Sequence, residues 1–272
     1  CIAVGAESSN DNLFQLTPSG SAVDCAKFDN QFRICFSDPN QGAASAQYIG
    51  ENKLATKVAI IYDSSDVYSS GIHDKFIAEA ANQGFEVVAD EAFTADNNTN
   101  FSVQIQKAQD ASAELVFLPI YYQQASLILV QAKQMGYEPD FFGCDGLDGL
   151  LTVENFDTSL AEGIMLLTPF AADAQDDLTK NFVTTYKEKY GDIPNQFAAD
   201  AYDAVYAIKA AGEKAGITPD MDASTICDKL KTAMTEVSVD GLTGLGMKWT
   251  ADGEPEKAPK AVKIVDGVYN AM

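Results

Sequence analysis

The stretch FFGCDG, residues 141–146, decides the fold class of this chain. Two aromatic residues suit a buried strand, and the Gly-x-Asp-Gly that follows is typical of a loop. The strand therefore ends by delivering one carboxylate, Asp145, to the edge of a sheet. In open α/β sheets, small ligands bind outside the carboxyl ends of the strands. We therefore interpret Asp145 as the residue that holds a ligand's ammonium group.

Strands and helices alternate regularly in the part of the chain that precedes this stretch. Residues 57–63 (KVAIIYD) and 115–120 are near-continuous apolar runs, which predict strands. Apolar residues at helical spacing follow each of them, over residues 69–83 and 123–135. Strands this apolar are buried on both faces, so the pattern indicates an α/β protein with a parallel sheet and helices on both sides.

The same periodicity predicts the remaining elements. The stretch of small residues that ends at about residue 52 is predicted to be a helix. The others are strands at 13–16, 32–36, 85–89 and 164–167, helices at 101–111, 175–190, 195–213 and 223–235, and a terminal antiparallel pair formed by 247–249 and 261–265.

The composition excludes several classes of function. A net charge of −22 over 272 residues disfavours nucleic acid and anionic membrane surfaces as partners. No apolar run approaches the ~20 residues that a membrane-spanning helix needs. The five cysteines show no CxxC and no metal spacing, so we expect mostly reduced and partly buried thiols.

An enzyme has little support in this sequence. No dinucleotide, phosphate-loop, nucleophile-elbow or zinc-protease motif is present. The single histidine, His73, lies in the middle of a predicted amphipathic helix, where we expect a surface or flank position. We therefore predict a protein without catalytic activity, cofactor or metal.

Aromatic residues follow two of the strands that precede Asp145. Tyr68 lies just beyond residues 57–63, and Tyr121 and Tyr122 lie just beyond residues 115–120. Because the carboxyl ends of parallel strands meet at one edge, we expect these rings beside Asp145. A carboxylate beside phenolic rings suits a primary ammonium, through a charge-assisted hydrogen bond and cation–π attraction.

The order and spacing of these motifs resemble those of the extracytoplasmic solute-binding proteins of the branched-chain amino acid type, which serve ABC transporters. The resemblance covers essentially the whole chain. It rests on TPSGS at 17–21, FRICFSDPNQG at 32–42, KVAIIYD at 57–63 with Tyr68 and Gly71, Tyr121–Tyr122, GCDG at 143–146, Glu162–Gly163, FAADAY at 197–202 and GLTG at 241–244.

The resemblance implies the type I periplasmic binding protein fold, with two doubly wound parallel-sheet lobes joined by three crossovers. Residues 1–37 and 169–250 would form lobe one, and residues 38–168 and 251–272 would form lobe two. Members of the family begin with a βαβαβ stretch that this sequence does not show, so we expect lobe one to be incomplete at its N-terminus.

The resemblance also implies the roles of six ligand-binding residues. Ser19 and Ser21 would bind the α-carboxylate and amino groups of the ligand, and Asp145 would pair with its α-ammonium. Tyr68 and Tyr121 would close over the ligand, and Phe197 would line the pocket for its side chain. The family often carries Glu at the acidic position, so the shorter Asp145 implies a ligand that is seated differently or has a different size.

The function implied by the family is the binding of a small solute, preferably an aliphatic amino acid, between the lobes and its delivery to an ABC transporter permease. The protein would act outside the cytoplasm, in the periplasm or lipid-anchored at the outer face of the cell membrane. The alternative is a ligand-binding sensor or receptor domain of the same fold that signals to a partner. Neither function involves nucleic acid or direct insertion of this chain into the membrane.

Overall fold

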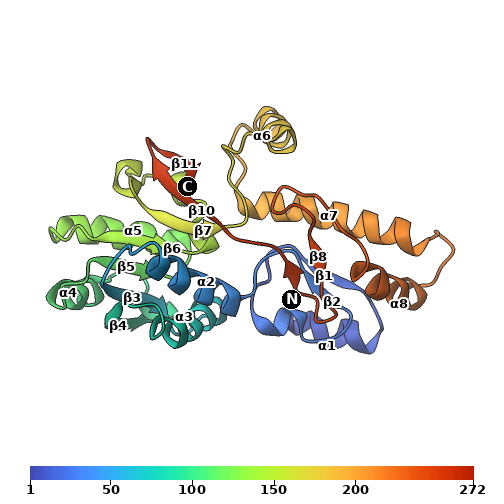
Figure 1. The fold of residues 1–272 in the computed structure, drawn as a ribbon, viewed down its shortest axis with the longest axis horizontal. Coiled ribbons are helices and arrows are strands. Elements are labelled where there is room, and N and C mark those ends of the chain that lie inside the picture. The colour runs from blue at the N-terminus through green and yellow to red at the C-terminus, as the bar shows by residue number, and fades with distance from the viewer. The chain divides into compact units, whose positions relative to one another are not determined.

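The chain crosses three times between two structural units, at 37/38, 173/174 and 258/259, in a computed structural model that describes residues 1–272 (Figure 1). Unit 1 comprises residues 1–37 and 174–258, and unit 2 comprises residues 38–173 and 259–272. The second and third boundaries predicted from the sequence, 168/169 and 250/251, lie a few residues earlier.

Unit 2 is built on a seven-stranded sheet with the order β11-β10-β7-β6-β5-β3-β4. Five neighbouring strands run parallel, and the last two strands of the chain are antiparallel additions at one edge. The parallel strands are β3 (Lys57–Asp63), β4 (Glu86–Phe93), β5 (Leu115–Leu118), β6 (Asp140–Gly143) and β7 (Met165–Thr168), and the others are β10 (Lys260–Val265) and β11 (Val268–Ala271).

Helices cover both faces of this sheet, because alternate residues of each strand point to opposite sides. Val58 and Ile60 of β3 pack with α2 (Asp38–Glu51) and α3 (Val67–Ala80). The intervening residues, such as Ile61, pack with α4 (Ser102–Asp110) and α5 (Tyr122–Gln134) on the other face (Figure 1). This arrangement confirms the predicted doubly wound parallel sheet.

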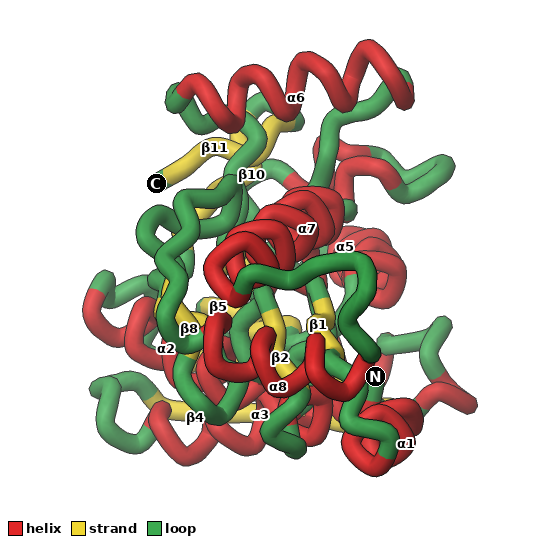
Figure 2. Tube along the Cα trace, turned by 90° about the vertical axis from the view of Figure 1, so that its right-hand side faces the viewer, coloured by secondary structure: helices red, strands yellow, loops and turns green.

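Unit 1 has two separate two-stranded sheets and four α-helices. β1 (Gln15–Thr17) pairs with β2 (Gln31–Arg33) in parallel, and β8 (Lys248–Trp249) pairs with β9 (Pro255–Glu256). The core joins β2 and β8 to α7 and α8, which lie side by side (Figure 2). The helices of this unit are α1 (Ile2–Asn10), α6 (Asp177–Tyr190), α7 (Gln196–Ala215) and α8 (Ala223–Met234).

The expected terminal strand pair is wrong in its partners. Residues 260–265 form β10, which pairs with β11 across a turn that contains Gly267 with a φ of +71°. Residues 248–249 form β8, which belongs to the other unit and pairs with β9. Both pairs are antiparallel hairpins of neighbouring strands, so the turn residues that close each hairpin set the pairing.

The expected surface or flank position of His73 is also wrong. His73 is buried in unit 2 with 8% of its surface exposed. Its Nδ1 and Nε2 atoms lie 3.0 Å and 2.9 Å from carboxylate oxygens of Asp74 and Asp90, and its ring stacks on Tyr62. A buried imidazole needs partners for both nitrogens, and the neighbouring helix residue and β4 supply them.

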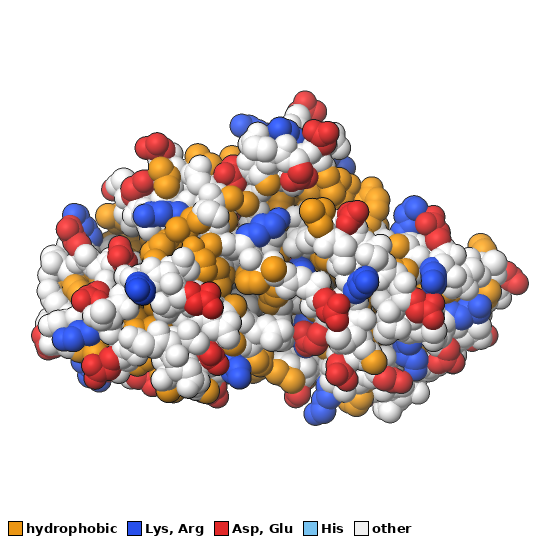
Figure 3. Space-filling model, in the orientation of Figure 1, with side chains coloured by type: hydrophobic (Ala, Val, Ile, Leu, Met, Phe, Trp, Pro, Cys, Tyr) orange, Lys and Arg blue, Asp and Glu red, His pale blue; other side chains and the backbone are white.

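Two surface features bear on the predicted partners. No helix combines the length and the apolar character needed to cross a membrane. On the face shown in Figure 3, acidic and basic side chains are interspersed in both units, without a broad basic patch.

Of the five cysteines, Cys1 is exposed and the other four are buried.

Candidate functional site

The polar residues predicted at the sheet edge follow three neighbouring strands of unit 2. β6, β5 and β3 are adjacent and parallel, so their carboxyl ends lie at one edge. Asp145 follows β6, Tyr121 is the residue before α5, and Tyr68 is the second residue of α3. Asp66 caps α3 by accepting a hydrogen bond from the Tyr68 N–H at 3.1 Å. This bond fixes the backbone position of Tyr68 at the start of the helix.

The Asp145 carboxylate is held by two side-chain donors. The Tyr68 hydroxyl donates to Oδ1 at 2.8 Å, and the Gln41 Nε2 amide donates to Oδ2 at 3.0 Å. All three residues are buried, with 4% to 6% of their surfaces exposed. A carboxylate held in this way is a fixed negative charge that suits a charge-assisted hydrogen bond from a cationic group.

Gly146 permits the close approach of Tyr68 to the Asp145 turn. Its N–H donates to the Tyr68 hydroxyl oxygen at 2.9 Å. A Cβ at this position would lie 2.5 Å from that oxygen and 2.8 Å from the carbonyl oxygen of Ile120. Only glycine therefore fits here, which gives the GCDG motif a physical reason beyond turn formation.

The two predicted tyrosines beyond β5 have different surroundings. The Tyr121 ring stacks on Tyr68 with a centroid distance of 4.7 Å, and Tyr121 is 40% exposed. Tyr122 packs against the apolar core and lies beside Gly149, where a Cβ would be 3.0 Å from its ring. Tyr121 is therefore the ring that faces outward beside Tyr68, and Tyr122 supports the loop that follows Asp145.

Burial and negative charge keep the Tyr68 phenol and the Cys144 thiol beside Asp145 protonated. Burial raises the pKa of the Tyr68 phenol well above its usual value, and the adjacent Asp145 charge raises it further. Burial also raises the pKa of the Cys144 thiol, with smaller contributions from Asp145 and Asp38. Tyr68 is therefore a neutral donor to the carboxylate, and negative potential from two aspartates reaches this edge of the sheet.

The serine-rich turn predicted to bind a carboxylate lies in unit 1, after β1. Ser19 is exposed and Ser21 is buried. The Arg33 guanidinium, fully buried, donates to the carbonyl oxygens of Gly20 at 3.1 Å and of Ser21, and forms an ion pair with Glu254 at 3.2 Å. Because these carbonyls are committed to Arg33, the turn is fixed from its inner side.

The structure therefore brings together three of the six predicted residues, namely Tyr68, Tyr121 and Asp145 of unit 2. Ser19 and Ser21 belong to unit 1, as does Phe197, which is half-buried in the first turn of α7 behind the Asn195 cap. Their ligand-binding roles stay predictions.

Sequence reasoning missed Gln41 as part of the cluster around Asp145. Gln41 lies in the first turn of α2, within the FRICFSDPNQG stretch on which the family resemblance partly rests. Its amide meets Asp145 across 104 positions of sequence, so the local pattern carries no signal of the contact.

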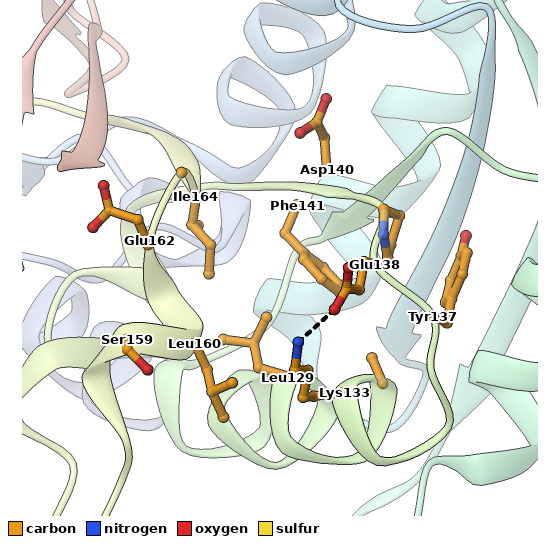
Figure 4. Close-up of a pocket in the computed structure, with 13 residues that line it drawn as sticks. Leu129, Lys133, Tyr137, Glu138, Asp140, Phe141, Ser159, Leu160, Glu162 and Ile164 are labelled. Carbon is orange, nitrogen blue, oxygen red and sulfur yellow. Dashed lines mark hydrogen bonds and ion pairs between the residues drawn. The ribbon is translucent and has the colours of Figure 1, made fainter.

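A hollow in unit 2 lies at the opposite ends of the strands from Asp145 (Figure 4). It has a volume of about 230 Å³ and lies beside the starts of β6 and β7. Leu129, Leu160 and Ile164 line it, and its Lys133 and Glu138 are paired with each other. The two opposite charges of this hollow therefore neutralise each other.

Residues 4–267 match the model of the periplasmic binding protein family, and the chain belongs to this family. The chain is similar to the leucine-, isoleucine-, valine-, threonine- and alanine-binding protein of Pseudomonas aeruginosa, with 27% identity over 209 residues. The aligned region covers 76% of this chain and 55% of that protein. This chain thus spans just over half the length of such curated relatives.

Solved structures confirm the type I fold. A leucine-binding protein of Thermotoga maritima is 25% identical, with a TM-score of 0.86 over 100% of this chain and 75% of that one. A branched-chain amino acid binding protein of Streptococcus pneumoniae, solved with isoleucine, is 26% identical, with a TM-score of 0.85 over 100% of this chain and 75% of that one. The family is a class of solute-binding proteins.

Proposed function

We propose that this chain binds an aliphatic amino acid and delivers it to an ABC transporter permease. The observation that carries the proposal is the buried Asp145 carboxylate, held by Tyr68 and Gln41 at the carboxyl edge of a parallel sheet. A fixed carboxylate suits the α-ammonium of a zwitterion, because it can accept a charge-assisted hydrogen bond. The names of the relatives, which bind leucine, isoleucine and valine, support the same ligand class.

The other predicted residues complete the proposal. Ser19 and Ser21 follow β1 in a turn of small residues, which suits the α-carboxylate of the ligand. Tyr121 offers an exposed aromatic face beside the carboxylate. Phe197 would contact an apolar side chain, so Phe197→Ala should weaken leucine binding more than glycine binding. Equal losses for both amino acids would remove Phe197 from the pocket.

The proposed place of action is outside the cytoplasm, where the permease partner receives its solutes. The family supports this location, since its members are periplasmic binding proteins. The acidic chain, with a net charge of −22, fits a protein that works in solution beside a membrane rather than on anionic lipid.

The test is a thermal-shift and calorimetric screen against the twenty amino acids, followed by Asp145→Asn. A ligand at 100 times its Kd should add about 2.7 kcal/mol to the free energy of unfolding. Removing the charged partner of the ammonium should cost about 2–5 kcal/mol of binding, or roughly 30- to 4,000-fold in Kd.

Asp145→Asn is a suitable variant because the site can accommodate it. The asparagine amide can accept from Tyr68, and the Gln41 amide can turn to present its oxygen to the new NH₂ group. The fold should therefore be kept while the charge is lost. Unchanged affinity in a folded Asp145→Asn variant would remove Asp145 from the site, and no response to any amino acid would overturn the proposed ligand class.

A further inference from the structure

The orientation of the Gln41 amide is set by the charge of its neighbour. A carboxylate accepts hydrogen bonds and donates none, so Gln41 must present its Nε2 amide to Asp145. The observed contact is this one, at 3.0 Å. The oxygen of the same amide, Oε1, must then point to another donor.

Gln41 Oε1 is buried and has no hydrogen-bond partner. The whole residue is only 5% exposed, so bulk water does not satisfy the oxygen. A buried acceptor without a donor is costly, and the large majority of such groups in folded proteins are paired. The Nε2 atom of the same amide donates to Asp145, so the unpaired Oε1 atom belongs to the cluster around Asp145.

A group that carries both positive charge and several N–H donors would serve both residues of the cluster. Asp145 supplies a carboxylate, and Gln41 adds a neutral acceptor in the same side-chain network. The Tyr68 hydroxyl is already used, because it donates to Asp145 and accepts from Gly146. A primary ammonium has three N–H bonds, so it can serve the carboxylate and the amide oxygen at once.

We propose that Gln41 is a ligand-recognition residue whose Oε1 accepts an N–H of the same primary ammonium that Asp145 pairs with. This inference rests on the proposed function and adds how the site selects ligands by the number of N–H bonds on their charged nitrogen. Ligands with a primary ammonium are preferred, and ligands whose nitrogen keeps one N–H lose the Gln41 bond while they retain the charge.

The test is a thermodynamic cycle with leucine and N,N-dimethylleucine, each measured by calorimetry against the wild-type protein and Gln41→Met. The dimethylated nitrogen keeps its charge and one N–H, which Asp145 takes. Wild type should therefore prefer leucine, and the preference should shrink by about 10- to 100-fold in Gln41→Met, the range for one hydrogen bond to a charged group. Any loosening of Asp145 by the variant affects both ligands and cancels in the cycle.

Gln104→Met is the matched control. Gln104 of α4 shows the same pattern, with Nε2 donating to the Ala92 carbonyl at 3.0 Å and a buried Oε1 without a partner, but it does not contact Asp145. The variant should leave both affinities at the wild-type values. Gln41→Leu gives a second variant for the cycle if the methionine replacement is poorly folded.

Three results separate the inference from the proposed function. A cycle with no coupling, while wild type binds leucine, overturns the role of Gln41 and leaves amino acid binding in place. Equal wild-type affinity for leucine and N,N-dimethylleucine overturns it without any variant. Failure of wild type to bind any amino acid overturns the proposed function and this inference with it.

Discussion

Replacing Tyr68 by phenylalanine tests how the site is held together. The change removes one oxygen and keeps the ring, so the stack on Tyr121 remains and no large cavity forms. The lost oxygen makes two buried hydrogen bonds, one donated to Asp145 Oδ1 at 2.8 Å and one accepted from the Gly146 N–H at 2.9 Å. Both partners stay in the protein after the substitution, so both lose a bond that water does not replace.

The expected cost follows from these two bonds. A hydrogen bond to a charged group contributes about 1.5–3 kcal/mol, and a buried N–H left without an acceptor costs about 1–3 kcal/mol. We therefore expect Tyr68→Phe to lower the free energy of unfolding by about 3–5 kcal/mol, with some relaxation of the Gly146 turn included. Leucine binding should weaken as well, because Asp145 is no longer fixed by two donors.

The assay is urea unfolding followed by circular dichroism, with the slope of the transition compared between proteins to show that the unfolded states match. Tyr190→Phe is the control, since Tyr190 is 62% exposed and should change the free energy by no more than about 0.5 kcal/mol. A Tyr68→Phe protein within about 1 kcal/mol of wild type would refute the assignment of both hydrogen bonds.

Three further predictions follow from other contacts. Gly146→Ala places a Cβ 2.5 Å from the Tyr68 oxygen, so calorimetry should show much weaker amino acid binding. Lys257→Met removes an ammonium that lies 3.5 Å from Asp200, with both side chains almost fully buried, and should cost about 3–5 kcal/mol of unfolding free energy in urea. Burial raises the pKa of Tyr137 to about 12, so its phenol should stay protonated in a spectrophotometric titration past its usual pKa near 10. The folded state holds this proton more tightly, so its contribution to stability is complete below about pH 10 and is lost as the pH rises toward 12.

Each of these has a control or a contradicting result. Gly212→Ala, in α7, places its Cβ no closer than 3.9 Å to another residue and should leave affinity unchanged. Lys209→Met breaks an exposed pair with Glu213 and should cost at most about 1 kcal/mol. Normal ligand binding by Gly146→Ala, a similar small loss for both lysine variants, or a Tyr137 phenol that titrates near pH 10 would each contradict the corresponding contact.

Residues 57–63 and 115–120 show why the fold of unit 2 was predictable. Their apolar runs, followed by residues at helical spacing, report burial on both faces of a strand, and burial is a local property of composition. The same pattern put Tyr68, Tyr121 and Asp145 after neighbouring strands, and the structure places the first two rings in contact and Asp145 at the Tyr68 hydroxyl.

The prediction for the end of the chain failed for the opposite reason. Residues 247–249 and 261–265 both read as strands, but strand character does not specify a partner. β8 pairs with β9 in unit 1, and β10 pairs with β11 and β7 in unit 2. The crossing at 258/259 separates the two runs, so each pairs with the neighbouring strand across its own turn, and the apolar pattern does not mark that crossing.

The sequence was enough to predict the class of fold, the edge of the sheet where ligands are expected, and the acidic residue at that edge. These follow from hydrophobic periodicity and turn chemistry, which act over a few residues. The packed structure was needed to show which side chains hold Asp145, that Gly146 must lack a Cβ, and that Gln41 has a buried oxygen without a donor. Those facts depend on atoms far apart in the chain, whose contacts are fixed only when the elements pack.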